Sequence, residues 1–80
     1  MTKDAKGNVV EVGDVIQITD SNDPWFPALM IVDELKGWGV MAYTYVVTND
    51  ESPNGQAYRR PKSEAFEVVG QAWIVNSPEA

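Results

Sequence analysis

The apolar residues of this chain come in short runs that turn-forming residues separate. Each run is rich in Val, Ile, Tyr or Trp, a composition typical of β-strands. The runs are 9–12, 14–19, 28–35, 38–47, 56–60 and 65–69, the last continuing after Gly70 into 71–75. The longest helix candidate, residues 29–40, presents no apolar face at helical spacing, and Gly37 and Gly39 would end it. The pattern therefore predicts an all-β protein of five to six short strands.

Alternation of apolar and polar residues is clearest toward the two ends of the chain. Around the bend at Gly13-Asp14, one parity holds Val10, Val12, Ile16 and Ile18, and near the C-terminus one parity holds Phe66, Val68, Ala72 and Ile74. Such alternation predicts half-buried strands with these residues facing the core. The two middle runs are apolar on both faces, so the pattern leaves their inward parity open.

The length of the chain limits it to one domain. A chain of 80 residues buries only about 60% of the surface that its unfolded form exposes, so one core must stabilise it. The dipeptide Lys36-Gly37 predicts a tight antiparallel hairpin between the two middle runs. We expect a single domain over residues 1–80, with an ordered core at about 9–75 and frayed termini.

The order of these segments resembles the small SH3-like β-barrels. The resemblance is carried by the strand Val12 to Ile18, the loop Asp23-Pro24-Trp25-Phe26-Pro27, and the strand Ala28 to Val32. Barrels of the KOW type, photosystem accessory subunits and small phage-encoded barrels open in a similar way. The resemblance implies a small SH3-like barrel of antiparallel strands. The Ala-Leu-Tyr-Asp-Tyr segment of signalling SH3 domains is missing, so binding of proline-rich peptides is not implied. An OB-like barrel is the alternative topology, but no segment offers its helix.

The chain contains no cysteine and no histidine. Disulfides, thiolate nucleophiles and Cys-type zinc sites all need cysteine, and histidine is the commonest general base and metal ligand. The neighbours Asp33 and Glu34 point to opposite faces of a strand, which is unsuitable for acid–base catalysis. The segment 20–24 lacks the distal glutamate of a calcium-binding loop. We therefore expect no enzyme, no cofactor and no metal site.

The same features bear on the compartment. Small secreted domains usually depend on disulfides, so their absence here indicates a reducing compartment. The polar residues 1–8 have no signal-peptide pattern. The most apolar stretch, Ala28 to Val32, is too short to cross a membrane. We expect a cytoplasmic protein.

Eight aromatic residues exceed what one small core can hold. One hypothesis places some of them in a partner-binding groove, with two aspartates that provide charge selectivity at its rim. The residues of this candidate surface are Trp25, Phe26, Trp38 and Tyr58, with Asp20 and Asp23 at the rim. The alternative is that Trp25 and Phe26 fold back and cap the barrel as a second small core.

The segment Arg59-Arg60-Pro61-Lys62 is the basic cluster of a chain whose formal net charge is -6. Tyrosines beside arginines could bind single-stranded nucleic acid by stacking. This alternative nucleic-acid face consists of Tyr43, Tyr45, Tyr58, Arg59 and Arg60 on one side of the sheet. Nucleic acid is nevertheless an unfavourable partner, because the net charge repels it and three cations bind it weakly. The other interpretation is that Arg59 or Arg60 forms ion pairs with carboxylates across strands.

From these observations we expect a non-enzymatic protein–protein interaction or assembly module. It would bind an unidentified protein, or a second copy of itself, through the aromatic loop surface. Its compact, acidic character resembles small accessory proteins of phages and mobile elements. The alternatives are a nucleic-acid-associated barrel of the KOW or cold-shock kind, and an acidic mimic of nucleic acid.

Overall fold

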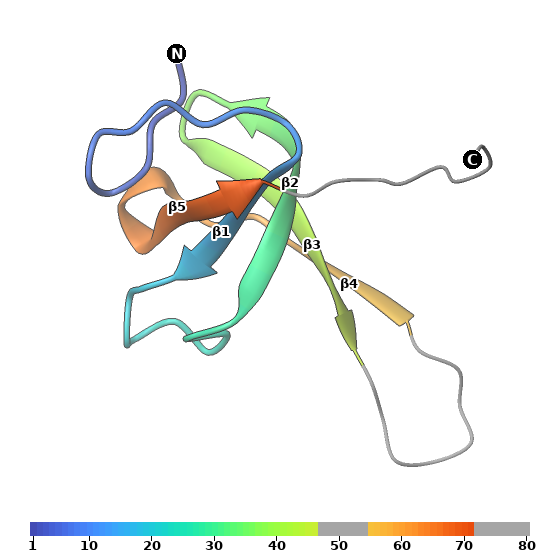
Figure 1. The fold of residues 1–80 in the computed structure, drawn as a ribbon. Helices are drawn as coiled ribbons and strands as arrows, with labels where there is room; N and C mark the ends of the chain where they lie inside the picture. Colours follow the sequence, from blue (N-terminus) through green and yellow to red (C-terminus); the bar gives the residue numbers. More distant parts are fainter. Residues whose placement is uncertain (47–54, 72–80) are drawn as a thin grey trace, which may run out of the picture.

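A computed structural model describes residues 1–46 and 55–71. Within these ranges five strands form one sheet, and a short 3-10 helix precedes the fifth strand (Figure 1). The elements are β1 (Asp14–Ile18), β2 (Leu29–Lys36), β3 (Gly39–Val46), β4 (Gly55–Arg59), η1 (Ser63–Ala65) and β5 (Phe66–Gln71). The predicted all-β fold is confirmed, and each strand falls close to the bounds of its predicted run.

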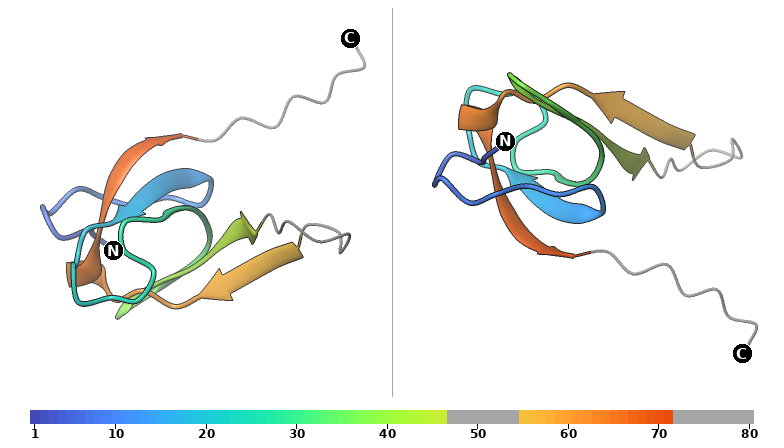
Figure 2. Two further views of the ribbon diagram at one scale, coloured as in Figure 1. Left: turned by 90° about the horizontal axis from the view of Figure 1, so that it is seen from below. Right: turned by 90° about the horizontal axis from the view of Figure 1, so that it is seen from above.

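The strand order is β4-β3-β2-β1-β5, and each neighbouring pair is antiparallel. Because β4 and β5 lie at opposite ends of this order, the sheet formed by the described residues is not closed into a barrel. Figure 2 shows a strongly curved sheet instead, with β1 and β5 on one side and β3 and β4 on the other. The first predicted run, 9–12, forms no strand, and Val9 makes a single bridge with Lys3. The SH3-like resemblance stays a prediction.

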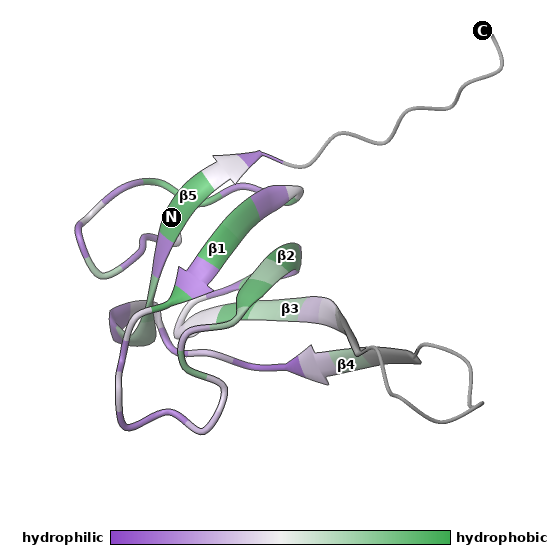
Figure 3. Cartoon of the chain, turned by 60° about the horizontal axis from the view of Figure 1, so that its bottom comes forward, coloured by the Kyte–Doolittle hydropathy of each residue, from purple (hydrophilic) through white to green (hydrophobic). Residues whose placement is uncertain are grey.

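The core consists of one parity of the strands, together with one residue of the N-terminal segment. Its buried members are Val10, Ile16, Ile18, Met30, Val32, Val40, Ala42 and Phe66. Ile16 lies opposite Met30, and Val32 lies opposite Ala42, so each pair shares the inner face of the sheet. This settles the inward parity of the middle strands. Figure 3 shows hydrophobic residues in β1, in β2 and in the middle of β5.

Val12 does not face the core, although its parity predicts that it should. Its side chain is 61% exposed, whereas Val10 is 1% exposed. The reason is a turn: the Asp14 carboxylate accepts a hydrogen bond of 2.8 Å from the Glu11 N–H, and Gly13 adopts a positive φ of 94°. A turn interrupts the period of two on which the prediction depends.

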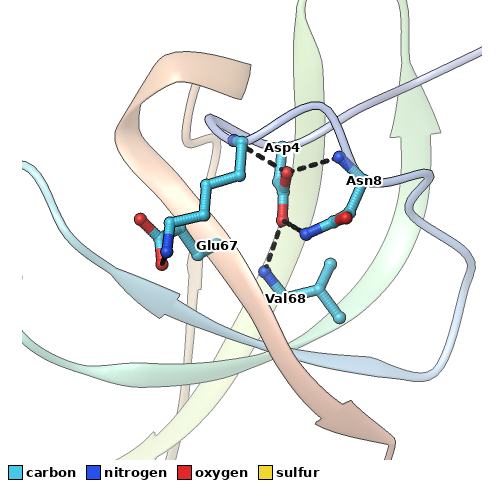
Figure 4. Close-up of polar contacts among 5 residues, drawn as sticks. Asp4, Asn8, Glu67 and Val68 are labelled. Atoms are coloured by element: carbon cyan, nitrogen blue, oxygen red, sulfur yellow. Dashed lines mark hydrogen bonds and ion pairs between the residues drawn. The ribbon is translucent and has the colours of Figure 1, made fainter.

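The N-terminal segment is tied to β5 by a buried aspartate, Asp4, which is 5% exposed. Its carboxylate accepts four hydrogen bonds (Figure 4). The donors are the backbone N–H groups of Lys6 (2.9 Å), Asn8 (2.8 Å) and Val68 (2.8 Å) and the side-chain amide of Asn8 (3.3 Å). Thr2, at the start of the same segment, is also buried.

The charge of Asp4 stabilises the folded state. Burial raises the pKa of Asp4, but the hydrogen bonds from Val68, Asn8 and Lys6 outweigh burial and hold the pKa below its ordinary value of 3.8. A carboxyl group with a lowered pKa in the folded protein contributes stability above the pKa of the unfolded chain. That contribution is lost as the pH falls through the folded-state pKa.

Substituting Asp4→Asn should lower the free energy of unfolding at pH 7 by about 1–3 kcal/mol, because the amide nitrogen cannot accept hydrogen bonds. The difference from wild type should shrink once the pH falls below the ordinary value of 3.8, where wild-type Asp4 takes up its proton. Urea unfolding across this pH range measures both effects. The control is Asp33→Asn at an exposed position, and an Asp4→Asn difference that does not change with pH would contradict the account.

The connection from β4 to η1 passes close over the start of β3. Gly39 forms a bridge with Lys62, and the Val40 N–H donates a hydrogen bond of 3.1 Å to the carbonyl oxygen of Pro61. A Cβ atom at Gly39 would collide with that same oxygen and lie 2.8 Å from the Cα of Lys62. Both are backbone atoms, so the position requires glycine.

Gly39→Ala should therefore destabilise the protein by about 1–3 kcal/mol, a typical cost of overpacking. Gly37→Ala is the matched control, because a Cβ at Gly37 meets no atom within 4 Å. Thermal and urea unfolding of the two variants provide the comparison. Equal stability of both variants would show that the close backbone contact is not a constraint.

Candidate functional site

The loop after β1, residues 19–28, is shaped by its two aspartates. The Asp20 carboxylate accepts a hydrogen bond of 2.9 Å from the backbone N–H of Asn22. The Asp23 carboxylate accepts one of 2.8 Å from the backbone N–H of Trp25. Aspartates stabilise turns in this way by binding the backbone two residues further on. The two residues predicted to provide charge at a binding rim therefore also determine the loop conformation.

Trp25 connects this loop to the end of β4. Its ring is half-buried against the core, and the guanidinium carbon of Arg59 lies 4.0 Å from the ring centroid. This distance is well inside the range of about 6 Å for cation–π attraction. Arg59 is paired with the buried Ala42, so its side chain leaves β4 on the inner face. Its Nη1 also donates a hydrogen bond of 2.7 Å to the carbonyl oxygen of Tyr58.

Trp25 and Arg59 border a hollow of about 260 Å³, hereafter the Trp25 hollow. It is lined by Ile18, Asp23, Pro24, Trp25, Met30, Arg59, Arg60 and Pro61. Ile18 and Met30 belong to the buried core, so the base of the hollow is apolar. Its volume is near the lower limit of about 300 Å³ for small-molecule pockets, and it suits one or two side chains of a partner better than a large cofactor.

The other predicted partner-binding aromatics do not line this hollow. Phe26, Trp38 and Tyr58 are each close to half exposed, and Trp38 lies in the turn between β2 and β3. Of the predicted partner-binding residues, Trp25 and Asp23 therefore line the hollow, and these three aromatics do not. The alternative expected both Trp25 and Phe26 to fold back as a second small core. Trp25 packs on the core, but Phe26 is exposed.

The predicted nucleic-acid residues do not form one surface. Tyr43 and Tyr58 are cross-strand partners with ring centroids 5.7 Å apart and an interplanar angle of 41°. Successive residues of a strand point to opposite faces, so Tyr58 lies on the outer face of β4 and Arg59 on the inner face. Arg60 lines the Trp25 hollow with Arg59. The side chain of Tyr45 lies outside the described residues.

A second hollow, of about 210 Å³, lies mainly on the outer face of the sheet and was not among the predicted sites. Its lining is Val15, Leu29, Met30, Ile31, Tyr43 and Thr44. Val15 pairs with Ile31, and Ile31 pairs with Tyr43, so these three form a row across the sheet. The apolar runs of β2 and β3 on both faces are the sequence signal of this surface.

Among the residues that the structure describes, Arg59 and Arg60 do not form the cross-strand ion pairs that the sequence made plausible. Over residues 1–46 and 55–71, ion pairs join Lys6 to Glu67 (3.7 Å) and Lys36 to Glu34 (3.3 Å). In these same ranges, no carboxylate lies within ion-pair distance of Arg59 or Arg60. The expectation of cross-strand pairing is therefore wrong for the part of the chain that the structure describes.

Within residues 1–46 and 55–71, no group of three or more acidic side chains is placed to hold a metal ion. The same ranges also include no helix with the length and apolar character needed to span a membrane.

Comparisons with protein-family models, with curated proteins and with solved structures gave no match. Function is therefore inferred from the geometry of the Trp25 hollow.

The contact between Arg59 and Trp25 should be measurable as a coupling energy. In a double-mutant cycle of Arg59→Ala and Trp25→Leu, urea unfolding should give a coupling of about 0.5–1 kcal/mol. The same cycle with Arg60→Ala in place of Arg59→Ala should give a coupling near zero, since Arg60 has no described contact with the ring. Equal coupling in the two cycles would refute the specific contact.

Proposed function

We propose that this protein is a non-enzymatic protein–protein interaction module that binds a short segment of a partner protein in the Trp25 hollow. The observation that carries the proposal is the Arg59 guanidinium stacked 4.0 Å from the Trp25 ring centroid, beside an apolar base. Tryptophan and arginine dominate the binding energy of many protein interfaces, particularly around a pocket that excludes water.

The Trp25 side chain is held in place before any partner binds. Asp23 fixes the backbone at Trp25, the core supports one side of the ring, and Arg59 lies over the ring. Preorganised side chains lose little conformational entropy on binding, which raises affinity. In the described part of the chain the indole N–H of Trp25 has no acceptor, so it is available to a carbonyl oxygen of the partner.

The nucleic-acid alternative has weaker support. A single-strand binder needs aromatic rings and cations along one path, whereas Tyr58 and Arg59 lie on opposite faces of β4. The net charge of -6 opposes binding of a polyanion as well. Relationship to accessory proteins of phages or mobile elements, and self-association as the mode of assembly, stay predictions.

A random peptide library displayed on phage tests the proposal even though the partner is unidentified. Selection on the immobilised wild-type protein should yield peptides that bind Trp25→Ala at least about tenfold more weakly, a typical loss for an interface hot spot. Trp38→Ala is the matched control, because Trp38 is an exposed tryptophan outside the hollow. Circular dichroism establishes that both variants are folded. Failure to select any peptide, or equal binding to Trp25→Ala, would refute the proposed site.

A further inference from the structure

The charge around the Trp25 hollow differs in sign from that of the chain as a whole. Asp and Glu outnumber Lys and Arg by 12 to 6, yet three of the six cations lie in the segment 59–62 beside the hollow. Two of these, Arg59 and Arg60, line it. Within residues 1–46 and 55–71, none of the three has a carboxylate partner at ion-pair distance. Positive charge is thus concentrated at this site, and no ion pair between described residues engages it.

The one carboxylate in the lining, Asp23, offsets only one of the two positive charges there. Its Oδ1 atom accepts a hydrogen bond from the backbone N–H of Trp25, which fixes the carboxylate within the loop. Against this single carboxylate the hollow presents two guanidinium groups, with an excess of one positive charge. Arg59 is also fixed in position by the Trp25 ring and by the Tyr58 carbonyl oxygen.

A fixed guanidinium group beside an apolar base suits a specific kind of ligand. Arginine binds carboxylates through two parallel N–H donors, and these charge-assisted bonds are stronger than neutral ones. The base formed by Ile18, Met30 and Trp25 suits an apolar side chain. A long polyanion would meet the remaining acidic surface of the protein, whereas a single carboxylate would meet only the hollow.

We infer that the segment bound in the Trp25 hollow presents an aspartate or glutamate next to an apolar residue. The apolar side chain occupies the base of the hollow, and the carboxylate pairs with Arg60 and with the outward N–H groups of Arg59. This inference rests on the proposed function, since it names the chemical class of partner for the same site.

Peptides selected from the random library provide the test. Those that depend on Trp25 should be enriched in Asp or Glu beside an apolar residue, and replacing that acid by Asn or Gln should weaken binding about tenfold. Arg60→Glu should weaken the same peptides by about tenfold or more, and a peptide with Lys in place of the acid should recover affinity for Arg60→Glu. Lys3→Glu is the control for net charge, since Lys3 is exposed and does not line the hollow.

The outcomes separate this inference from the proposal beneath it. If the selected peptides depend on Trp25 but carry no excess of acidic residues, the acidic specificity is wrong, whereas the interaction site is supported. Equal losses in Arg60→Glu and Lys3→Glu would also overturn it, because the effect would then come from net charge alone. If no selected peptide depends on Trp25, both the site and its specificity fall.

Discussion

The close passage of the β4–η1 connection over Gly39 determines where the basic segment 59–62 lies. Without a Cβ at Gly39, the carbonyl oxygen of Pro61 can reach the N–H of Val40, and the chain crosses β3 at its first residues. Arg59 and Arg60 directly precede this crossing and are thereby directed toward the loop that carries Trp25. Backbone hydrogen bonds, from the Val40 N–H to Pro61 and from the Ser63 N–H to Trp38, hold this crossing. The side chains of Arg59 and Arg60 are not needed for it and line the hollow instead.

The local features of the fold could be predicted from the sequence. Strands follow from β-branched and aromatic runs of suitable length, and turns follow from Gly, Pro, Asn and Asp, so both depend on neighbours in the chain. Val12 shows the limit of this approach, since one hydrogen-bonded turn at Asp14 reversed the face that alternation predicted. Closure into a barrel was a non-local expectation, and the strand order of the described residues does not provide it.

The candidate site was predicted only in part, because some of its contacts join residues far apart in the sequence. Trp25 was identified because a large aromatic residue in a polar loop is conspicuous, whereas its contact with Arg59 depends on how the sheet curves. Grouping Tyr58 with Arg59 failed because adjacent strand residues face opposite ways, and only Arg59 is on the inner face. Asp4 was missed altogether, since its importance comes from the N–H of Val68, near the other end of the chain.

Binding of a partner segment in the Trp25 hollow can be mapped residue by residue with NMR. A ¹⁵N-labelled sample would be titrated with a selected peptide while the backbone amide signals and the indole and arginine side-chain N–H signals are followed. The largest shifts are expected at Trp25, Arg59 and Arg60, with Trp38 unaffected. Shifts centred on Val15, Ile31 and Tyr43, the row on the outer face of the sheet, would contradict this expectation and assign binding to the opposite surface.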